Sequence, residues 1–246
     1  MSRTQILAIG VDQVTMAEAV ERCMEWVHSD STHLVVTPNA EIGYAAARNP
    51  ELAAVINGAD LVIPDGIGVV LAARILGNPV PGKVAGVELT NNLLEALSRR
   101  GEGRVYLLGT RPEVVAKAAE HVARQYPGVQ VVGYHDGFFK DEEDAPVVAA
   151  IREARPDFLV VGMGSPRQEQ WLYRHRAELN AKVCIGVGGG IDIWGGAGRR
   201  APEWALKTNL EWLWRMVHFG RYSRVLPPLA KFVLLVMAQR LKGKSK

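Results

Sequence analysis

The chain has 246 residues, of which 48% are hydrophobic and 22% are charged. These values are typical of a globular protein with one or two domains, and they exclude disordered, collagen-like and coiled-coil chains. Cys23 and Cys184 have no CxxC spacing, which argues against a disulfide framework or a zinc finger and favours a reducing cytoplasm. We expect no signal peptide and no membrane-spanning helix, because no apolar stretch reaches about 18 residues.

The net charge of +3 is unevenly distributed along the chain. Residues 199–246 contain eleven Lys or Arg and two acids, a net charge of +9, whereas residues 1–198 carry −6. A basic segment after an acidic body predicts an anionic partner for that segment. The candidates are a nucleic acid, an anionic membrane surface and a phosphate-bearing substrate.

Short apolar runs alternate with segments of helical length up to Trp194. The runs predict seven strands, which are Gln5–Val11, His33–Thr37, Asp60–Pro64, Arg104–Gly109, Val129–Tyr134, Asp157–Gly162 and Lys182–Val187. The clearest helical signals between them are in Met16–Trp26, Pro112–Gln125 and Pro146–Ala154. Because the strands are apolar throughout, we predict an α/β fold with a mostly parallel sheet and helices on both of its faces.

The pattern changes after Trp194, where no further strand is predicted. Pro202–His218 predicts one helix and Leu229–Leu241 another, with Gly220 and Pro227–Pro228 as interruptions between them. We therefore expect a helical C-terminal appendage that packs on the α/β body or is hinged to it.

The expected domain boundary gives an α/β body over residues 1–194 and a basic appendage over residues 195–246. The last helix combines apolar residues with lysines and arginines, a pattern that favours a helix lying on an anionic lipid surface. The alternative is a terminal helix that docks on the core. An exposed apolar face in this region could also pair subunits as a homo-oligomer.

Small or polar residues follow almost every predicted strand. In open α/β sheets, ligands bind beyond the carboxyl ends of the strands, so these residues are candidates for one site. The candidates are Thr37, Asn39, Asp65, Gly109, Thr110, Arg111, Tyr134, Gln168, Gly188, Gly189, Gly190 and Asp192.

Asp65 is the sharpest of these candidates, because it directly follows the apolar run Leu61–Ile63. Its carboxylate could be a general base, or it could cap a helix that starts near Ile67. Thr37 and Asn39 are ambiguous in the same way, as cap residues or as groups that bond a substrate.

The glycine triplet at residues 188–190 would let a phosphate or a nucleotide ring approach the backbone closely, although a tight turn is the alternative. Neither the GxGxxG fingerprint nor a GxxxxGK[ST] loop is present. The sequence also lacks HExxH or another metal-ligand cluster and lacks a GxSxG elbow, so we predict no metal site and no α/β-hydrolase.

Arginines of the basic segment could supply the positive charge that a diphosphate needs when no metal holds it. Arg215, Arg221 and Arg224 lie among aromatic residues, and guanidinium groups match phosphate oxygens in pairs. The alternatives are a solvated or membrane-facing surface, or a surface that stacks nucleic-acid bases.

Five motifs in this order resemble the WecG/TagA/CpsF family of bacterial glycosyltransferases. They are TPNAE at Thr37–Glu41, IPDGIG at Ile63–Gly68, GMGSPRQE at Gly162–Glu169, GVGG at Gly186–Gly189 and NLEWL at Asn209–Leu213. The resemblance covers nearly the whole chain. It implies a family-specific α/β transferase fold in which the body is catalytic and the appendage completes the site at the membrane.

The resemblance also implies a reaction. N-acetylmannosamine would be transferred from UDP to the C4 hydroxyl of an N-acetylglucosaminyl diphospho-polyprenol, with inversion and without metal or cofactor. The enzyme would be cytoplasmic and peripheral on the inner membrane face, in wall teichoic acid or related surface glycan synthesis. The donor sugar stays open among N-acetylmannosamine, its uronic acid and glucose.

Residue by residue, the resemblance implies that Asp65 is the catalytic base. Thr37 and Asn39 match pocket residues on the acceptor and donor sides, and Thr37 is expected to be catalytic together with Asp65. Gln168 matches a pocket glutamine. Lys83 departs from the family, which usually has an arginine at this position; lysine keeps the charge and loses bidentate contact.

The tail arginines Arg215, Arg221 and Arg224 resemble those thought to close over the diphosphate. We therefore expect a UDP-sugar, a lipid-linked acceptor and an anionic membrane surface as partners, and no nucleic acid. Three other classes remain as alternatives: a nicotinamide-dependent oxidoreductase, a nucleic-acid-binding protein and a non-catalytic membrane scaffold.

Overall fold

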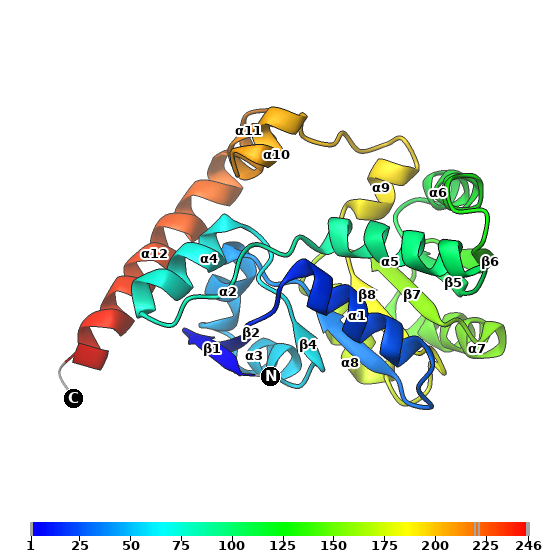
Figure 1. The fold of residues 1–246 in the computed structure, drawn as a ribbon, viewed down its shortest axis with the longest axis horizontal. Coiled ribbons are helices and arrows are strands. Elements are labelled where there is room, and N and C mark those ends of the chain that lie inside the picture. Colours follow the sequence, from blue (N-terminus) through cyan, green and yellow to red (C-terminus); the bar gives the residue numbers. More distant parts are fainter. Residues whose placement is uncertain (1, 219, 221, 245–246) are drawn as a thin grey trace.

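The computed structural model describes residues 2–218, 220 and 222–244 (Figure 1). Its centre is a six-stranded sheet in the order β4-β3-β8-β7-β5-β6, and all neighbouring strands are parallel. The strands are β3 (His33–Val36), β4 (Leu61–Val62), β5 (Arg104–Gly109), β6 (Gln130–His135), β7 (Phe158–Gly162) and β8 (Val183–Gly186). The predicted α/β fold is confirmed, and so are six of the seven predicted strands.

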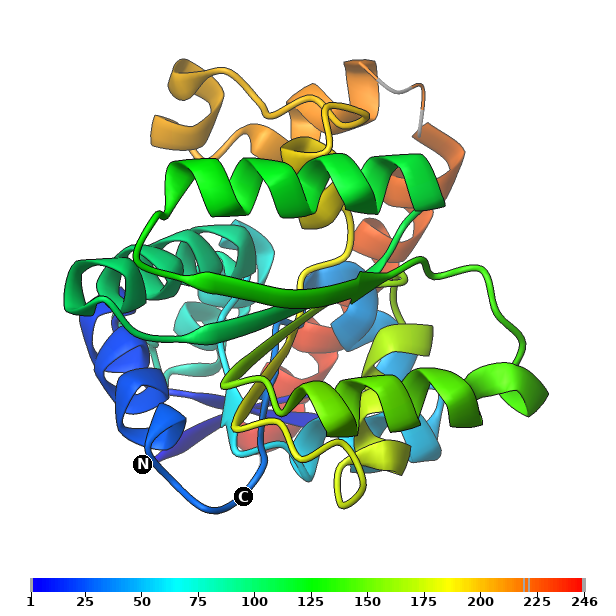
Figure 2. The same cartoon turned by 90° about the vertical axis from the view of Figure 1, so that its right-hand side faces the viewer.

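Apolar side chains alternate between the two faces of this sheet and build a core on each. In β7, Leu159 and Val161 belong to one core, and Phe158 and Val160 belong to the other. The first face is covered by α2 (Ala40–Ala46), α3 (Pro50–Asn57), α4 (Ile67–Leu76), α7 (Asp144–Ala154) and α8 (Arg167–His175). The second is covered by α1 (Met16–Val27), α5 (Gly86–Arg100), α6 (Pro112–Gln125) and α9 (Gly190–Trp194). Figure 2 shows α6 and α7 on opposite sides of β5 and β6.

The first predicted strand, Gln5–Val11, is wrong as a single element. The segment is an antiparallel hairpin of β1 (Arg3–Ile6) and β2 (Ile9–Asp12). The chain turns at Leu7, whose φ of 53° is unusual for a branched residue. A distant side chain supports this turn, because the Leu7 N–H donates to Gln239 Oε1 at 2.9 Å.

The predicted helix Pro202–His218 is also wrong as one element. It is divided into α10 (Glu203–Lys207) and α11 (Glu211–His218). Asn209 lies between them with a φ of 59°, a left-handed conformation that asparagine adopts more readily than most residues.

The last helix, α12 (Tyr222–Lys244), starts before the predicted Leu229 and contains Pro227 and Pro228 within it, so the predicted interruption there is wrong. Phe232 and Val236 of α12 are buried in the first core, and α12 packs against α2 and α4 (Figure 1). Through α12, the C-terminal segment (the appendage predicted over residues 195–246) therefore shares a core with the body. Within the described residues, no helix combines the length and the apolar character needed to span a bilayer.

Candidate active site

A cavity of about 1220 Å³ lies beyond the carboxyl ends of the strands. Residues that follow β3, β4, β5, β7 and β8 form one wall, and α11 and α12 contribute the opposite one. Pockets for a single small ligand usually measure about 300–1,000 Å³. This cavity is therefore somewhat larger than a usual single-ligand pocket.

Most of the predicted site residues meet in this cavity. Its lining includes Thr37, Asn39, Asp65, Lys83, Thr110, Arg111, Gln168, Gly188, Gly189, Asp192 and Arg215. Gly109 and Gly190 are next to lining residues, and Tyr134 is half-exposed on the edge strand β6, away from the cavity. Arg221 lies outside the described residues, as does the side chain of Arg224.

Asp65 stands in the short segment between β4 and α4. The interpretation of Asp65 as a helix cap is wrong, because the N-cap of α4 is Gly66, with a φ of 90°. The Asp65 side chain is half-buried and lines the cavity. The pKa of this carboxyl is raised to about 7, first by burial and then by the nearby Glu211 carboxylate, against the lowering effects of the Gly86 N–H, Lys83 and Arg215.

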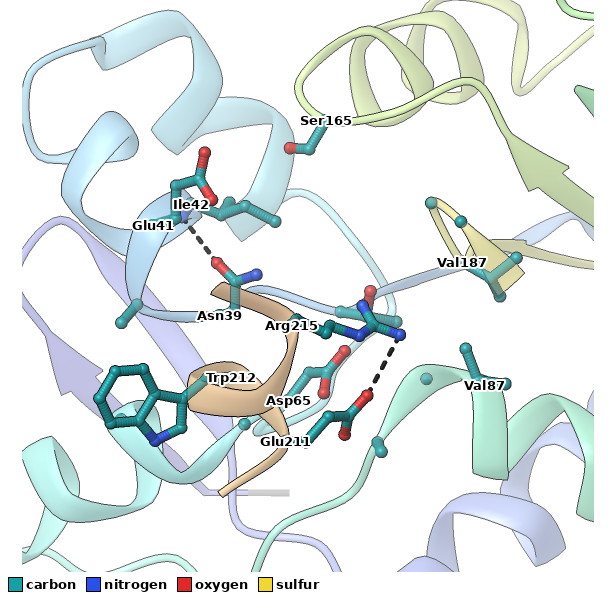
Figure 3. Close-up of a pocket in the computed structure, with 18 of the residues that line it drawn as sticks. Asn39, Glu41, Ile42, Asp65, Val87, Ser165, Val187, Glu211, Trp212 and Arg215 are labelled. Atoms are coloured by element: carbon teal, nitrogen blue, oxygen red, sulfur yellow. Dashed lines mark hydrogen bonds and ion pairs between the residues drawn. The ribbon is translucent and has the colours of Figure 1, made fainter. Parts of the chain in front are cut away.

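Thr37 and Asn39 each make a hydrogen bond to the backbone that fixes the position of the side chain. The Thr37 hydroxyl donates to the Gly186 carbonyl at 3.0 Å, which ties the end of β3 to the end of β8. Asn39 caps α2, since its Oδ1 accepts from the Ile42 N–H at 3.0 Å. Figure 3 shows the Asn39 amide nitrogen on the side away from this cap, where a substrate could accept from it.

Gln168 is buried and fixes the glycine loop after β8. Its Oε1 accepts from the Gly188 N–H at 3.1 Å, and its Nε2 donates to Glu169 Oε1 at 2.8 Å. The Gly190 N–H is also used, because it donates to Val187 O at 3.0 Å. Gly189 is thus the one member of the triplet whose N–H has no hydrogen-bond partner among the described residues.

Thr110 and Asp192 join the loop after β5 to helix α9. Thr110 has a φ of 54°, and its hydroxyl makes a short hydrogen bond to Asp192 Oδ1. Arg111 is exposed beside Glu113, with Nε and Oε1 3.4 Å apart. Asp192 therefore has a structural partner, whereas the Arg111 guanidinium is in a screened ion pair that an anion could replace.

Glu211 is the main site residue that the sequence analysis missed. It lies in the NLEWL motif, but no spacing in the sequence connects it to Asp65. Its Oε1 pairs with Arg215 Nη2 at 3.1 Å, one turn along α11, and Figure 3 shows both side chains beside Asp65. Arg200 was missed too; it lines the cavity and pairs with Glu88 at 3.5 Å.

Four charged side chains therefore face one corner of the cavity: Asp65, Lys83, Glu211 and Arg215. Guanidinium and ammonium groups can bind phosphate oxygens, and a carboxylate whose pKa is near neutrality can accept a proton. Among the described residues, no three His, Cys, Asp or Glu side chains are grouped so as to hold a metal ion.

Comparisons with known proteins agree with this chemistry. The family model described as "Glycosyl transferase WecG/TagA/CpsF family" matches residues 4–246. Three relatives named N-acetylglucosaminyldiphosphoundecaprenol N-acetyl-beta-D-mannosaminyltransferase are also similar. The one from Bacillus spizizenii is 34% identical over 85% of this chain and 83% of its own length. The one from Staphylococcus aureus strain NCTC 8325 is 33% identical, over 100% of this chain and 94% of its own length. The one from Bacillus subtilis strain 168 is 30% identical, over 86% of this chain and 82% of its own length.

The family model spans nearly the whole chain, and the relative from Staphylococcus aureus covers all of it. All five sequence motifs contribute residues to the lining of the cavity, and Asp65 is one of these residues. The chain therefore belongs to the WecG/TagA/CpsF family of glycosyltransferases.

Proposed function

We propose that this enzyme transfers N-acetylmannosamine from UDP-N-acetylmannosamine to the C4 hydroxyl of N-acetylglucosaminyl diphospho-undecaprenol, forming a β-1,4 linkage with inversion. The names of the relatives support the acceptor and the transferred sugar. The observation that carries the proposal is the Asp65 carboxyl, which lines the large cavity beyond the strand ends and has a pKa of about 7.

Asp65 acts as the general base in this proposal. With a pKa of about 7, a substantial fraction of the carboxyl is ionised at neutral pH, and the ionised form accepts the proton of the C4 hydroxyl. The C4 oxygen then forms a bond to the anomeric carbon from the face opposite UDP. The bond between that carbon and the diphosphate oxygen breaks, and UDP leaves with the electron pair.

Cationic side chains stabilise the UDP leaving group in place of a metal. Arg215 and Lys83 line the cavity near Asp65, and Arg221 and Arg224 follow along the same segment. The Gly189 N–H is a further donor for a phosphate oxygen. Such preorganised positive groups act on the charge that develops on the leaving oxygen.

The C-terminal segment brings the enzyme to its lipid-linked acceptor on the inner membrane face. On α12, side chains such as Leu234 and Leu241 are 69% and 66% exposed and apolar. Basic residues interspersed with exposed apolar ones favour an anionic lipid surface. The product would enter wall teichoic acid or related surface glycan synthesis.

A transfer assay tests the proposal. Purified protein is incubated with a synthetic N-acetylglucosaminyl diphospho-lipid and UDP-N-acetylmannosamine, with and without EDTA, and the lipid products are analysed by mass spectrometry. We expect the disaccharide-lipid in both samples. Product only without EDTA would overturn metal independence, and product only from the uronic acid or glucose donor would change the donor. Absence of product from all three donors would contradict the proposed reaction.

A further inference from the structure

Asp65 belongs to the body, whereas two of the charged groups around it belong to the C-terminal segment. Lys83 comes from the segment before α5, and Glu211 and Arg215 come from α11. The Gly86 N–H at the start of α5 donates to the carboxyl, and the first turn of α4 has no acidic residue. Glu211 is thus the one carboxylate among the charged groups that act on Asp65 in the described structure.

The contact between Glu211 and Arg215 fixes the position of both. They are four residues apart on α11, and Glu211 Oε1 lies 3.1 Å from Arg215 Nη2. The Glu211 side chain is only 28% exposed, so its charge is less screened than that of a surface residue. A guanidinium has five N–H donors, and this contact therefore leaves others for phosphate oxygens.

We propose that Glu211 is a positioning residue for the transfer reaction: its carboxylate holds Arg215 over the cavity and places a second negative charge beside the base, so that the base depends on the seating of α11. This inference rests on the proposed role of Asp65. Two carboxylates that share a site resist ionising together, which keeps a proton on Asp65 to higher pH. The Glu211 charge therefore makes Asp65 a stronger base, whereas Arg215 on the same helix acts in the opposite direction.

The test compares E211Q with wild type in two independent pH series. The first is kcat/KM for sugar transfer between pH 5 and 9. The second is the thermal midpoint of the protein without substrate over the same range, with D65N used to identify the part due to Asp65. In both series we expect E211Q to lower the apparent pKa of Asp65 by about half to one pH unit.

Two further variants separate charge from structure. E211D keeps the negative charge and should retain the wild-type pKa. E203Q removes an exposed carboxylate on α10, which pairs with Lys207 at 3.2 Å, and should leave both series unchanged. An E211Q enzyme that loses activity equally at every pH, with an unmoved pKa, would overturn the inference.

The thermal series distinguishes a failure of the Glu211 inference from a failure of the proposed function. If no transfer is detected with any donor, the proposed reaction fails, but the thermal midpoints still report the coupling of Glu211 to Asp65. An unshifted thermal series would contradict the coupling even in an active enzyme.

Discussion

The two walls of the cavity are built in different ways. On the wall formed by the strand ends, Thr37, Gln168 and Thr110 each hydrogen-bond to a residue in another part of the body. On the wall formed by α11, Glu211 and Arg215 bond to each other, and their side chains are 28% and 42% exposed. The strand-end wall thus sets the shape of the site, whereas the α11 wall keeps charges that can exchange water for a ligand.

The largest expected effect comes from Asp65, where the two walls meet. D65N should retain the fold and lose about 10²–10⁴-fold in transfer rate, because the amide cannot accept the proton of the acceptor hydroxyl. Turnover is measured with the lipid-linked acceptor, and folding by circular dichroism. D30N, at a fully exposed aspartate, is the control and should behave as wild type. Near-normal turnover of D65N would remove Asp65 as the base.

Two neighbouring substitutions compare how much the buried face and the exposed face of α12 contribute to the stability of the protein. Phe232 is 1% exposed and Val233 is 44% exposed. F232A should lower the free energy of unfolding by about 3–5 kcal/mol, because it leaves a cavity in the core. V233A should change it by no more than about 0.5 kcal/mol. Urea unfolding measures both, and equal effects would mean that α12 is not part of the core.

A smaller effect is expected at Gln168, within the strand-end wall. Q168L leaves the Gly188 N–H without its partner, and an unsatisfied buried group costs about 1–3 kcal/mol. We expect kcat/KM for the UDP-sugar to fall by about tenfold or more, as the glycine loop loses its anchor. Q170L, at a half-buried position on the same helix, is the control. A Q168L enzyme with unchanged kcat/KM would show that the loop holds its shape without this bond.

The last prediction concerns a pH dependence of stability. The Asp65 pKa of about 7 lies above the ordinary 3.8, so the folded protein holds this proton more tightly than the unfolded chain. The resulting stabilisation is complete below about pH 4 and is lost as the pH rises through 7. D65N lacks this loss, and its Tm relative to wild type should be higher at pH 8 than at pH 5. Scanning calorimetry at both pH values measures the difference, and a constant difference would exclude a raised pKa.

The sheet could be predicted from the sequence because each strand is a short apolar run buried on both faces. The strand-end wall follows from the sheet, since parallel strands deliver Thr37, Asp65 and Gln168 to one edge. The N-terminal hairpin could not be predicted in this way. Leu7 and Ala8 carry no turn signal, and the turn is stabilised by Gln239 from the other end of the chain.

The α11 wall was predicted only in part. Asn209 was a usable signal for the break before α11, because asparagine tolerates the left-handed conformation. The two prolines in α12 suggested an interruption. The helix instead continues through both prolines, and its residues Phe232 and Val236 pack in the core of the body. Glu211 could not be assigned, because its neighbours in space, Asp65 and Lys83, are more than a hundred residues away in the sequence.

The contact between Leu7 and Gln239 has a consequence for synthesis. The two residues are 232 positions apart, and the Gln239 amide also reaches Gln5 O at 3.3 Å. A chain that emerges from the ribosome therefore lacks this support for its first turn until α12 has left the exit tunnel. Phe232 and Val236 of α12 also line the cavity. The substrate site of the nascent enzyme is therefore incomplete until α12 has been translated.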